Sequence, residues 1–207
     1  MVVAHDGADG VQVVMLRRSA RNRFAPGFVV FPGGAQERED TRLAGQWFAD
    51  EHQAARACAV RELGEETGLA LTAAGPQATR NGEHPGDAVS QSPPDAAALV
   101  QIGRWVAPEF LAVRFDAVFF AVRADAALPL RVDGVEEDRA WWARPADVLD
   151  EGTLYETLMW PTYRTLEALA GCGSVDDVLR LSVAQEPPPP GRRARSPEWR
   201  AAGPRAG

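Results

Sequence analysis

Residues 61–69 read Arg61-Glu62-Leu63-Gly64-Glu65-Glu66-Thr67-Gly68-Leu69. The three glutamates are spaced i, i+3 and i+4, so on a helix they lie on one face. Unit charges about 5–6 Å apart repel by roughly 3 kcal/mol per pair at an effective dielectric of about 20. A hard divalent cation such as Mg²⁺ removes that repulsion, because it takes several carboxylate oxygens as ligands. The stretch is therefore either a metal site or a solvated acidic face, and its surroundings decide between the two.

The residues before and after this triplet predict the helix that carries it. Asp50 can cap the N-terminus, with Gln53 three residues later as its capping-box partner. Gly68 can supply a left-handed C-terminal cap. Val60 and Leu63 point to the core, and the three acids point to the other side.

The rest of the chain alternates between apolar runs and turn residues. We expect strands at Met1–Ala4, Val11–Leu16, Phe28–Phe31, Val100–Val106, Phe115–Val122 and Ala140–Trp142. We expect further helices at Pro145–Leu149, Pro161–Leu169 and Val175–Leu181. Strands first, a helix across them, then more strands and terminal helices predict an α+β sandwich.

We expect a single domain over residues 1–183. Within it, residues 73–95 are rich in Gly, Pro, Ser, Asn and Asp, which predicts a long, mobile insertion. Residues 184–207 hold a proline run and an Arg/Pro/Gly-rich end, which predicts a disordered tail. The 207 residues are 45% hydrophobic and 25% charged, a globular composition.

Net charge indicates which classes of partner are unfavourable, and cysteine content indicates the redox state of the compartment. A formal net charge of −7 does not favour nucleic-acid or membrane binding. The two cysteines, Cys58 and Cys172, are too few for a disulfide scaffold, so a reduced cytoplasmic protein is the expectation. Cys58 lies one turn before Glu62, but it has no evident base, and we expect it to be a core residue.

The stretch 61–69 resembles the helical half of the Nudix box, Arg-Glu-apolar-x-Glu-Glu-x-Gly-apolar, at every fixed position. The loop half begins with Gly34, and Asp40 stands where the family usually has Glu. Residues 41–60 make the gap before Arg61 longer than usual, so the box carries an insertion. The resemblance implies the Nudix α/β/α sandwich with a mixed sheet. It also implies Mg²⁺- or Mn²⁺-dependent hydrolysis of a nucleoside diphosphate-X substrate, and a possible homodimer.

A second motif narrows the branch. Arg18-Ser19, Arg23, Gly27 and Phe31-Pro32-Gly33-Gly34 are spaced as in a motif of coenzyme A diphosphatases, although the leading Leu-Leu-Thr of that motif is absent. The similarity implies that CoA or acyl-CoA is cleaved to adenosine 3′,5′-bisphosphate and a 4′-phosphopantetheine product. Two alternatives stay open: a diphosphatase for ADP-ribose, NADH or another dinucleotide, and a non-catalytic Nudix-fold binding or regulatory module.

The resemblance assigns roles to particular residues. The metal ligands are expected to be Glu62, Glu65, Glu66 and the carbonyl of Gly33. Arg61 is expected to orient the site. The catalytic base is left open between the box residues Glu62 and Glu65 and a later acid, Glu136 or Glu137, which could equally lie in a solvated hairpin. The substrate is expected to contact Arg18, Arg23, Gly34 and Asp40, since arginine suits phosphate through its rigid fork of donors.

Overall fold

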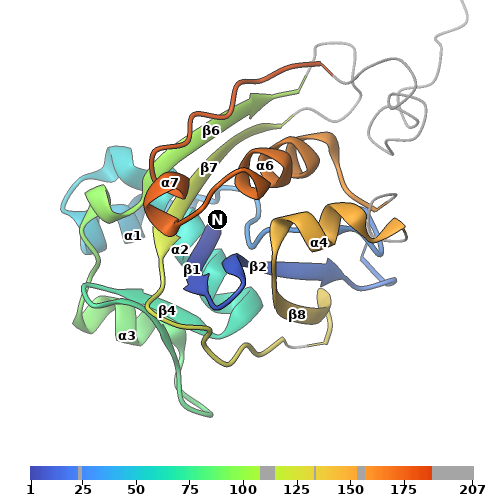
Figure 1. Cartoon of the computed structure of the whole chain (residues 1–207). Coiled ribbons are helices and arrows are strands. Elements are labelled where there is room, and N and C mark those ends of the chain that lie inside the picture. Colours follow the sequence, from blue (N-terminus) through green and yellow to red (C-terminus); the bar gives the residue numbers. More distant parts are fainter. Residues whose placement is uncertain (23–24, 108–114, 133, 153–156, 188–207) are drawn as a thin grey trace, which may run out of the picture.

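A mixed six-stranded sheet forms the centre of the computed structural model, which describes residues 1–22, 25–107, 115–132, 134–152 and 157–187 (Figure 1). Its strands are β1 (Val2–Gly7), β2 (Gly10–Arg18), β3 (Val29–Val30), β6 (Val100–Val106), β7 (Asp116–Arg123) and β8 (Glu137–Ala143). The path runs β3-β2-β1-β7-β6, and β8 pairs with β2. All six expected strands are present, with ends shifted by a few residues.

Strand pairing sets which residues meet at the site. β1 and β2 form an antiparallel hairpin that closes at Gly7 and Gly10, as the Gly/Asp-rich turn predicts. β1 and β7 pair in parallel, which makes the sheet mixed. β8 lies antiparallel to β2 and brings Glu137 opposite Arg18. A residue from late in the chain is thereby placed beside the end of the second strand.

Helices cover both faces of the sheet, as the period of two in β1 requires. Val3 belongs to the core under α1 (Arg38–Phe48), α2 (Ala54–Thr67) and α3 (Pro85–Gln91). Val2 and Ala4 belong to the core under α4 (Pro145–Asp150), α6 (Trp160–Ala170) and α7 (Val175–Val178). The predicted α/β/α sandwich is confirmed (Figure 1). Among the described helices, none combines the length and apolar character needed to cross a membrane.

The insertion in the box is a helix that the sequence did not predict. Helix α1 begins after Glu37 with a reciprocal capping box to Asp40, and it ends at Ala49 in a left-handed conformation with φ of 54°. The expected helix then follows: Asp50 caps a short 3₁₀ turn (Glu51–Gln53) that leads into α2. The extra residues therefore form a separate helix before α2.

The segment that we expected to be an irregular insertion also contains regular structure. β4 (Leu69–Thr72) pairs with β5 (Gly75–Ala78), and α3 follows with a proline in its first turn. Val89 on α3 is only 1% exposed, and the Ser90 hydroxyl accepts a hydrogen bond of 3.1 Å from Trp47 Nε1. The composition predicted loop, but the apolar contacts of α3 order it against α1.

The expected tail is fastened at its start. Val183 N–H donates to Ile102 O at 2.7 Å, and the Gln185 side-chain amide exchanges two hydrogen bonds with the backbone of Val106. Trp160 Nε1 donates to the carbonyl of Glu186. Residues 182–186 thus lie along the edge strand β6, where they satisfy backbone groups that an exposed edge would leave open. The remaining tail, 188–207, lies outside the described residues.

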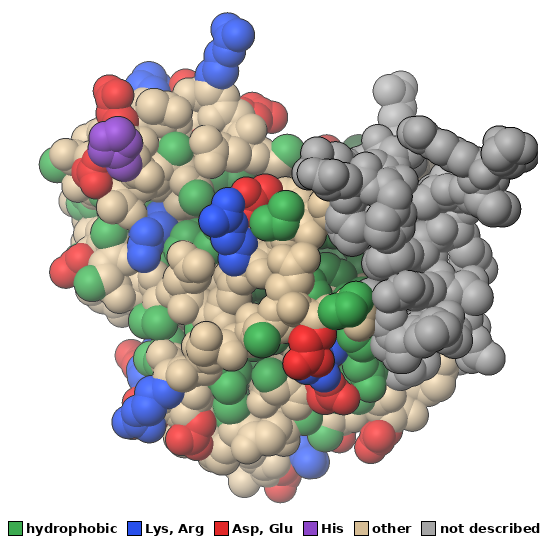
Figure 2. All heavy atoms as spheres, turned by 90° about the horizontal axis from the view of Figure 1, so that it is seen from above, with side chains coloured by type: hydrophobic (Ala, Val, Ile, Leu, Met, Phe, Trp, Pro, Cys, Tyr) green, Lys and Arg blue, Asp and Glu red, His purple; other side chains and the backbone are tan. Residues whose placement is uncertain are grey.

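Charged side chains are interspersed on the surface. On the face shown in Figure 2, the described acidic and basic side chains alternate instead of gathering by sign. Many are in exposed ion pairs such as Arg17 with Asp138 at 2.6 Å. Such pairs contribute little stability, so the fold depends on its two cores.

We expect the Val89→Ala variant to lower the free energy of unfolding by roughly 1.5–3 kcal/mol, since it removes two buried methyl groups and leaves a cavity. Urea unfolding measures the change. Val106→Ala is the matched control: Val106 is 38% exposed, so its loss should cost less than about 0.5 kcal/mol. Equal effects would mean that α3 is not packed as described.

Candidate active site

Helix α2 carries the acidic triplet on its last turns. The helix ends at Gly68, which adopts φ of 70° and donates its N–H to Gly64 O at 2.9 Å. The three acids differ in environment: Glu62 is half-buried, Glu65 is exposed, and Glu66 is only 6% exposed. The triplet is therefore not a simple solvated face.

The loop after β3 lies directly against these acids. Gly33 N–H donates to Glu66 Oε2 at 2.8 Å. Gly33 has φ of 151°, a conformation that side chains rarely adopt. At Gly34, an added Cβ would lie 2.3 Å from Glu62 Oε1, so a side chain here would displace the Glu62 carboxylate. The two glycines bring the loop backbone within hydrogen-bonding distance of the acidic turn.

The Arg61 guanidinium connects three carboxylates. It donates to both oxygens of Asp40, at 2.8 and 3.1 Å. Nη1 lies 2.8 Å from Glu62 Oε1 and 2.9 Å from Glu65 Oε2. The Asp40 hydrogen bonds and the neighbouring acids raise the pKa of Arg61 above its usual value. The paired hydrogen bonds to Asp40 use the rigid, forked guanidinium of arginine, a geometry that lysine cannot supply.

Glu66 carries the largest electrostatic cost. Burial, and next the charge of Glu137, raise the pKa of Glu66 to about 9, while the Gly33 N–H opposes the shift. Glu137 itself is 2% exposed at the start of β8. Burial also raises the pKa of Glu62. The site therefore holds buried acids whose charges a bound cation would neutralise.

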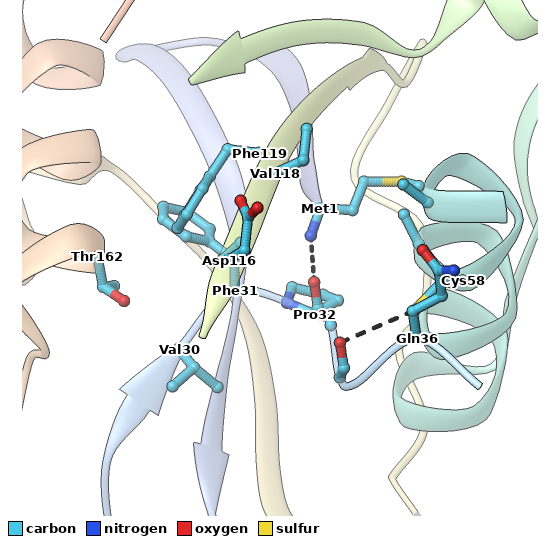
Figure 3. Close-up of a pocket in the computed structure, with 15 residues that line it drawn as sticks. Met1, Val30, Phe31, Pro32, Gln36, Cys58, Asp116, Val118, Phe119 and Thr162 are labelled. Atoms are coloured by element: carbon cyan, nitrogen blue, oxygen red, sulfur yellow. Dashed lines mark hydrogen bonds between the residues drawn. The ribbon is translucent and has the colours of Figure 1, made fainter. Parts of the chain in front are cut away.

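A cavity of about 240 Å³ opens beside this loop (Figure 3). Gly33 and Gly34 form part of its wall, together with α2, β7 and the start of α6. The Cys58 thiol lines it and contacts the Gly34 carbonyl at 3.8 Å. Burial raises the pKa of this thiol to about 12, so it is not a nucleophile near neutral pH.

A crystal structure of a NUDIX hydrolase from Alicyclobacillus acidocaldarius superposes with a TM-score of 0.74 and 30% sequence identity. The match covers 89% of this chain and 95% of that chain. The chain belongs to the Nudix hydrolase family.

Other comparisons are narrower. "Putative nudix hydrolase 7" of Caenorhabditis elegans is 37% identical over 70 residues, 34% of this chain and 21% of that protein. The chain thus matches about a fifth of the length of this curated relative. The NUDIX domain of Shewanella oneidensis NrtR, crystallised with ADP ribose, shares 15% identity over 72% of this chain and 71% of that chain. Its TM-score of 0.44 is too low to inform the site. No family model matches the chain.

In this Nudix hydrolase the expected site residues separate into groups. The structure brings together Arg61, Glu62, Glu65, Glu66, Gly33, Gly34 and Glu137. Glu136 is exposed, and its carbonyl accepts the Ser19 N–H at 2.8 Å. Arg18 is half-buried opposite Glu137. Arg23 lies outside the described residues.

Asp40 is placed differently from our expectation of a substrate contact. Its side chain is 0% exposed, and both oxygens are engaged by Arg61 while Oδ2 also accepts the Glu37 N–H at 2.7 Å. No oxygen of Asp40 faces solvent, so substrate cannot touch it in this arrangement. Its position instead fixes Arg61.

The donor set fits a hard divalent cation in chemistry, since carboxylate oxygens are the ligands that Mg²⁺ prefers. Among the described side chains, no group of three His, Cys, Asp or Glu is arranged to hold an ion as it stands. The reason is visible: Glu62 and Glu65 turn toward Arg61, and Glu66 turns toward Gly33. Binding an ion would require Glu62 or Glu65 to turn from the guanidinium.

Sequence reasoning missed the cavity and the burial of Asp40. The Glu37/Asp40 capping pair was a local signal for α1, but the Asp40 acid was assigned to the loop of the box. The cavity has no local signal, because its wall comes from five separate parts of the chain.

We expect Glu66 to contribute a fall in the stability of the metal-free protein as pH rises from about 5 to 9. With a folded pKa of about 9 and an ordinary unfolded value, Glu66 retains a proton in the folded state that the unfolded chain has lost. The slope contributed by one proton is at most about 1.4 kcal/mol per pH unit. Urea unfolding across this range, with EDTA present, measures it.

Glu66→Gln should flatten this slope, because glutamine does not titrate. It should also remove any stabilisation by added Mg²⁺. Glu65→Gln is the matched control, since Glu65 is exposed and its substitution should leave the slope unchanged. Identical slopes in wild type and Glu66→Gln would contradict the burial of a titrating Glu66.

Proposed function

We propose that this Nudix hydrolase cleaves the phosphoanhydride of a nucleoside diphosphate-X substrate, specifically the diphosphate of CoA or acyl-CoA. The observation that carries the proposal is the acidic turn of α2 held against the Gly33–Gly34 loop, with Glu137 beside Glu66. Anhydride hydrolysis needs charge neutralised on the non-bridging oxygens and a water placed for attack. Buried acids with raised pKa values are typical of such sites.

Glu62, Glu65, Glu66 and the carbonyl of Gly33 would hold Mg²⁺ or Mn²⁺. When bound, the ion would neutralise negative charge on the diphosphate oxygens. Arg61, which contacts both Glu62 and Glu65, would orient the one that stays on the guanidinium when the other turns to the ion. Asp40 would not contact the ion or the substrate, and would act by positioning Arg61.

In the proposed reaction, a water oxygen bonds to one phosphorus and the bridging P–O bond breaks. The water proton passes to a carboxylate, and two phosphomonoesters leave. Glu137 is favoured over Glu136 as that carboxylate, because Glu137 is buried near Glu66 and Glu136 is exposed. Glu62 and Glu65 are the alternative bases within the box.

The proposed substrate rests on the motif around Arg18. Arg18 ends β2 and pairs in register with Glu137, so its position next to the acidic cluster supports contact with a phosphate. Arg23, from the same motif, would make a second contact. The products would be adenosine 3′,5′-bisphosphate and 4′-phosphopantetheine or its acyl thioester.

Turnover measurements on a substrate panel distinguish the proposal from two alternatives, a diphosphatase for ADP-ribose or dinucleotides and a non-catalytic binding module. Purified protein would be assayed with Mg²⁺ or Mn²⁺ against CoA, octanoyl-CoA, dephospho-CoA, ADP-ribose and NADH, with products identified by mass. We expect CoA-type substrates to be preferred, and loss of the 3′-phosphate to lower kcat/KM. An equal rate on dephospho-CoA would remove the CoA assignment; preference for ADP-ribose or NADH would replace it. No hydrolysis of any member would support a binding module.

We expect excess EDTA to abolish turnover and Mg²⁺ to restore it. Glu65→Gln should lower kcat by roughly 10²–10⁴-fold, the range for loss of a group that acts in the transition state. Glu167→Gln, at an exposed position of α6, is the control and should leave kcat unchanged. Undiminished turnover by Glu65→Gln would undo its catalytic assignment. A homodimer, which the family resemblance implies, is checked by sedimentation of the same preparation.

A further inference from the structure

The cavity beside the Gly33–Gly34 loop adjoins the acidic turn. Gly34 lies against Glu62 and also lines the cavity. A group joined to a diphosphate at the acidic turn therefore has direct access to this space. Figure 3 shows side chains from β3, β7, α2 and α6 around it.

The walls of the cavity are mostly apolar. Val30 and Phe31 contribute from β3 and its loop, Val118 and Phe119 from β7, and Ala55 and Ala59 from α2. Phe31 and Phe119 meet edge to face, with ring centroids 6.3 Å apart. The two alanines are one helical turn apart, so α2 presents a small-residue wall that leaves room for a ligand.

The polar side chains of the cavity are poorly suited to a nucleobase. A base is recognised through donors and acceptors at fixed positions on its edge. Both oxygens of Asp116 are committed to Arg104, at 2.7 and 2.5 Å. The Cys58 thiol is directed at the Gly34 carbonyl. The Gln36 and Thr162 side chains are the other polar ones on this wall, and Gln36 is exposed.

We infer that this cavity binds the uncharged arm of the substrate, the pantetheine-like half attached to the second phosphate. The assignment rests on the proposed function, because it needs the diphosphate at the acidic turn. The methylene and methyl groups of such an arm gain affinity of about fourfold each when they are buried. The nucleoside half then lies outside this cavity.

The test uses the two separate products as probes, so that binding is read without catalysis. Calorimetric titration in Mg²⁺ would compare 4′-phosphopantetheine with adenosine 3′,5′-bisphosphate. Ala55→Leu fills the cavity from α2 and should weaken 4′-phosphopantetheine binding by about tenfold or more. Adenosine 3′,5′-bisphosphate should change by less than about threefold.

Val30→Phe fills the same cavity from β3 and keeps the test valid if Ala55→Leu does not fold. Ala170→Leu, at an exposed position of α6, adds the same bulk elsewhere and should change neither affinity. Thermal unfolding confirms that each variant is folded.

Each outcome has one meaning. Selective loss of 4′-phosphopantetheine binding supports the assignment. Selective loss of adenosine 3′,5′-bisphosphate binding would assign the cavity to the nucleoside half, and unchanged binding of both would remove it from the substrate site. If wild type hydrolyses no diphosphate and binds neither product, the proposed function itself fails.

Discussion

The ion pair between Asp40 and Arg61 is the contact on which the site depends. Asp40 is fully buried, and a buried carboxylate without its partner costs several kcal/mol. The two side chains therefore have to be placed together, which fixes the start of α1 against the last turns of α2. The remaining donors of Arg61 then hold Glu62 and Glu65 in position. One guanidinium thus links the packing of two helices to the geometry of the acidic turn.

Unlike Asp40, Glu66 is a buried carboxylate without a compensating basic side chain among its described contacts. Arg61 compensates the charges of its own neighbours, but burial and the charge of Glu137 raise the pKa of Glu66 to about 9. The Gly33 N–H offsets this only in part. A sequence selected for stability alone would not place two buried carboxylates close together, so the cost at Glu66 is expected of a functional site. In the acidic turn, Arg61 therefore compensates the charges of Glu62 and Glu65. The ionised form of Glu66, by contrast, would be stabilised by a bound cation.

The sequence predicted what local signals encode. Gly68 ends the helix and apolar periodicity places Val60 and Leu63 in the core, as expected, whereas Asp50 caps the 3₁₀ turn before α2 and not α2 itself. Helix α1 was missed because its first turn is acidic and was assigned to the loop of the box. Helix α3 was missed because Gly, Pro and Ser dominate its segment, although the proline at its start is a helix signal.

The meeting of Glu137 with Glu66 could not be predicted from local patterns. It depends on the register between β8 and β2, which aligns Glu137 with Arg18, and on the side of the sheet that α2 covers. The sequence left Glu136 and Glu137 as equal candidates, because the residue at which β8 begins, and its pairing with β2, decide which of the two is buried.

The insertion is tolerated because the ion pair is anchored at both ends. Asp40 and Arg61 are 21 residues apart, but Asp40 is fixed by the capping box of α1 and Arg61 by α2. Added chain between two anchored ends costs little closure entropy, and α1 offsets the cost of ordering by burying Leu43 and Trp47. Helices α1 and α3 also enclose a second cavity, lined by Arg61 and Glu65 where the first is lined by Gly33 and Gly34. The inserted residues of α1 therefore form part of the surroundings of the acidic turn.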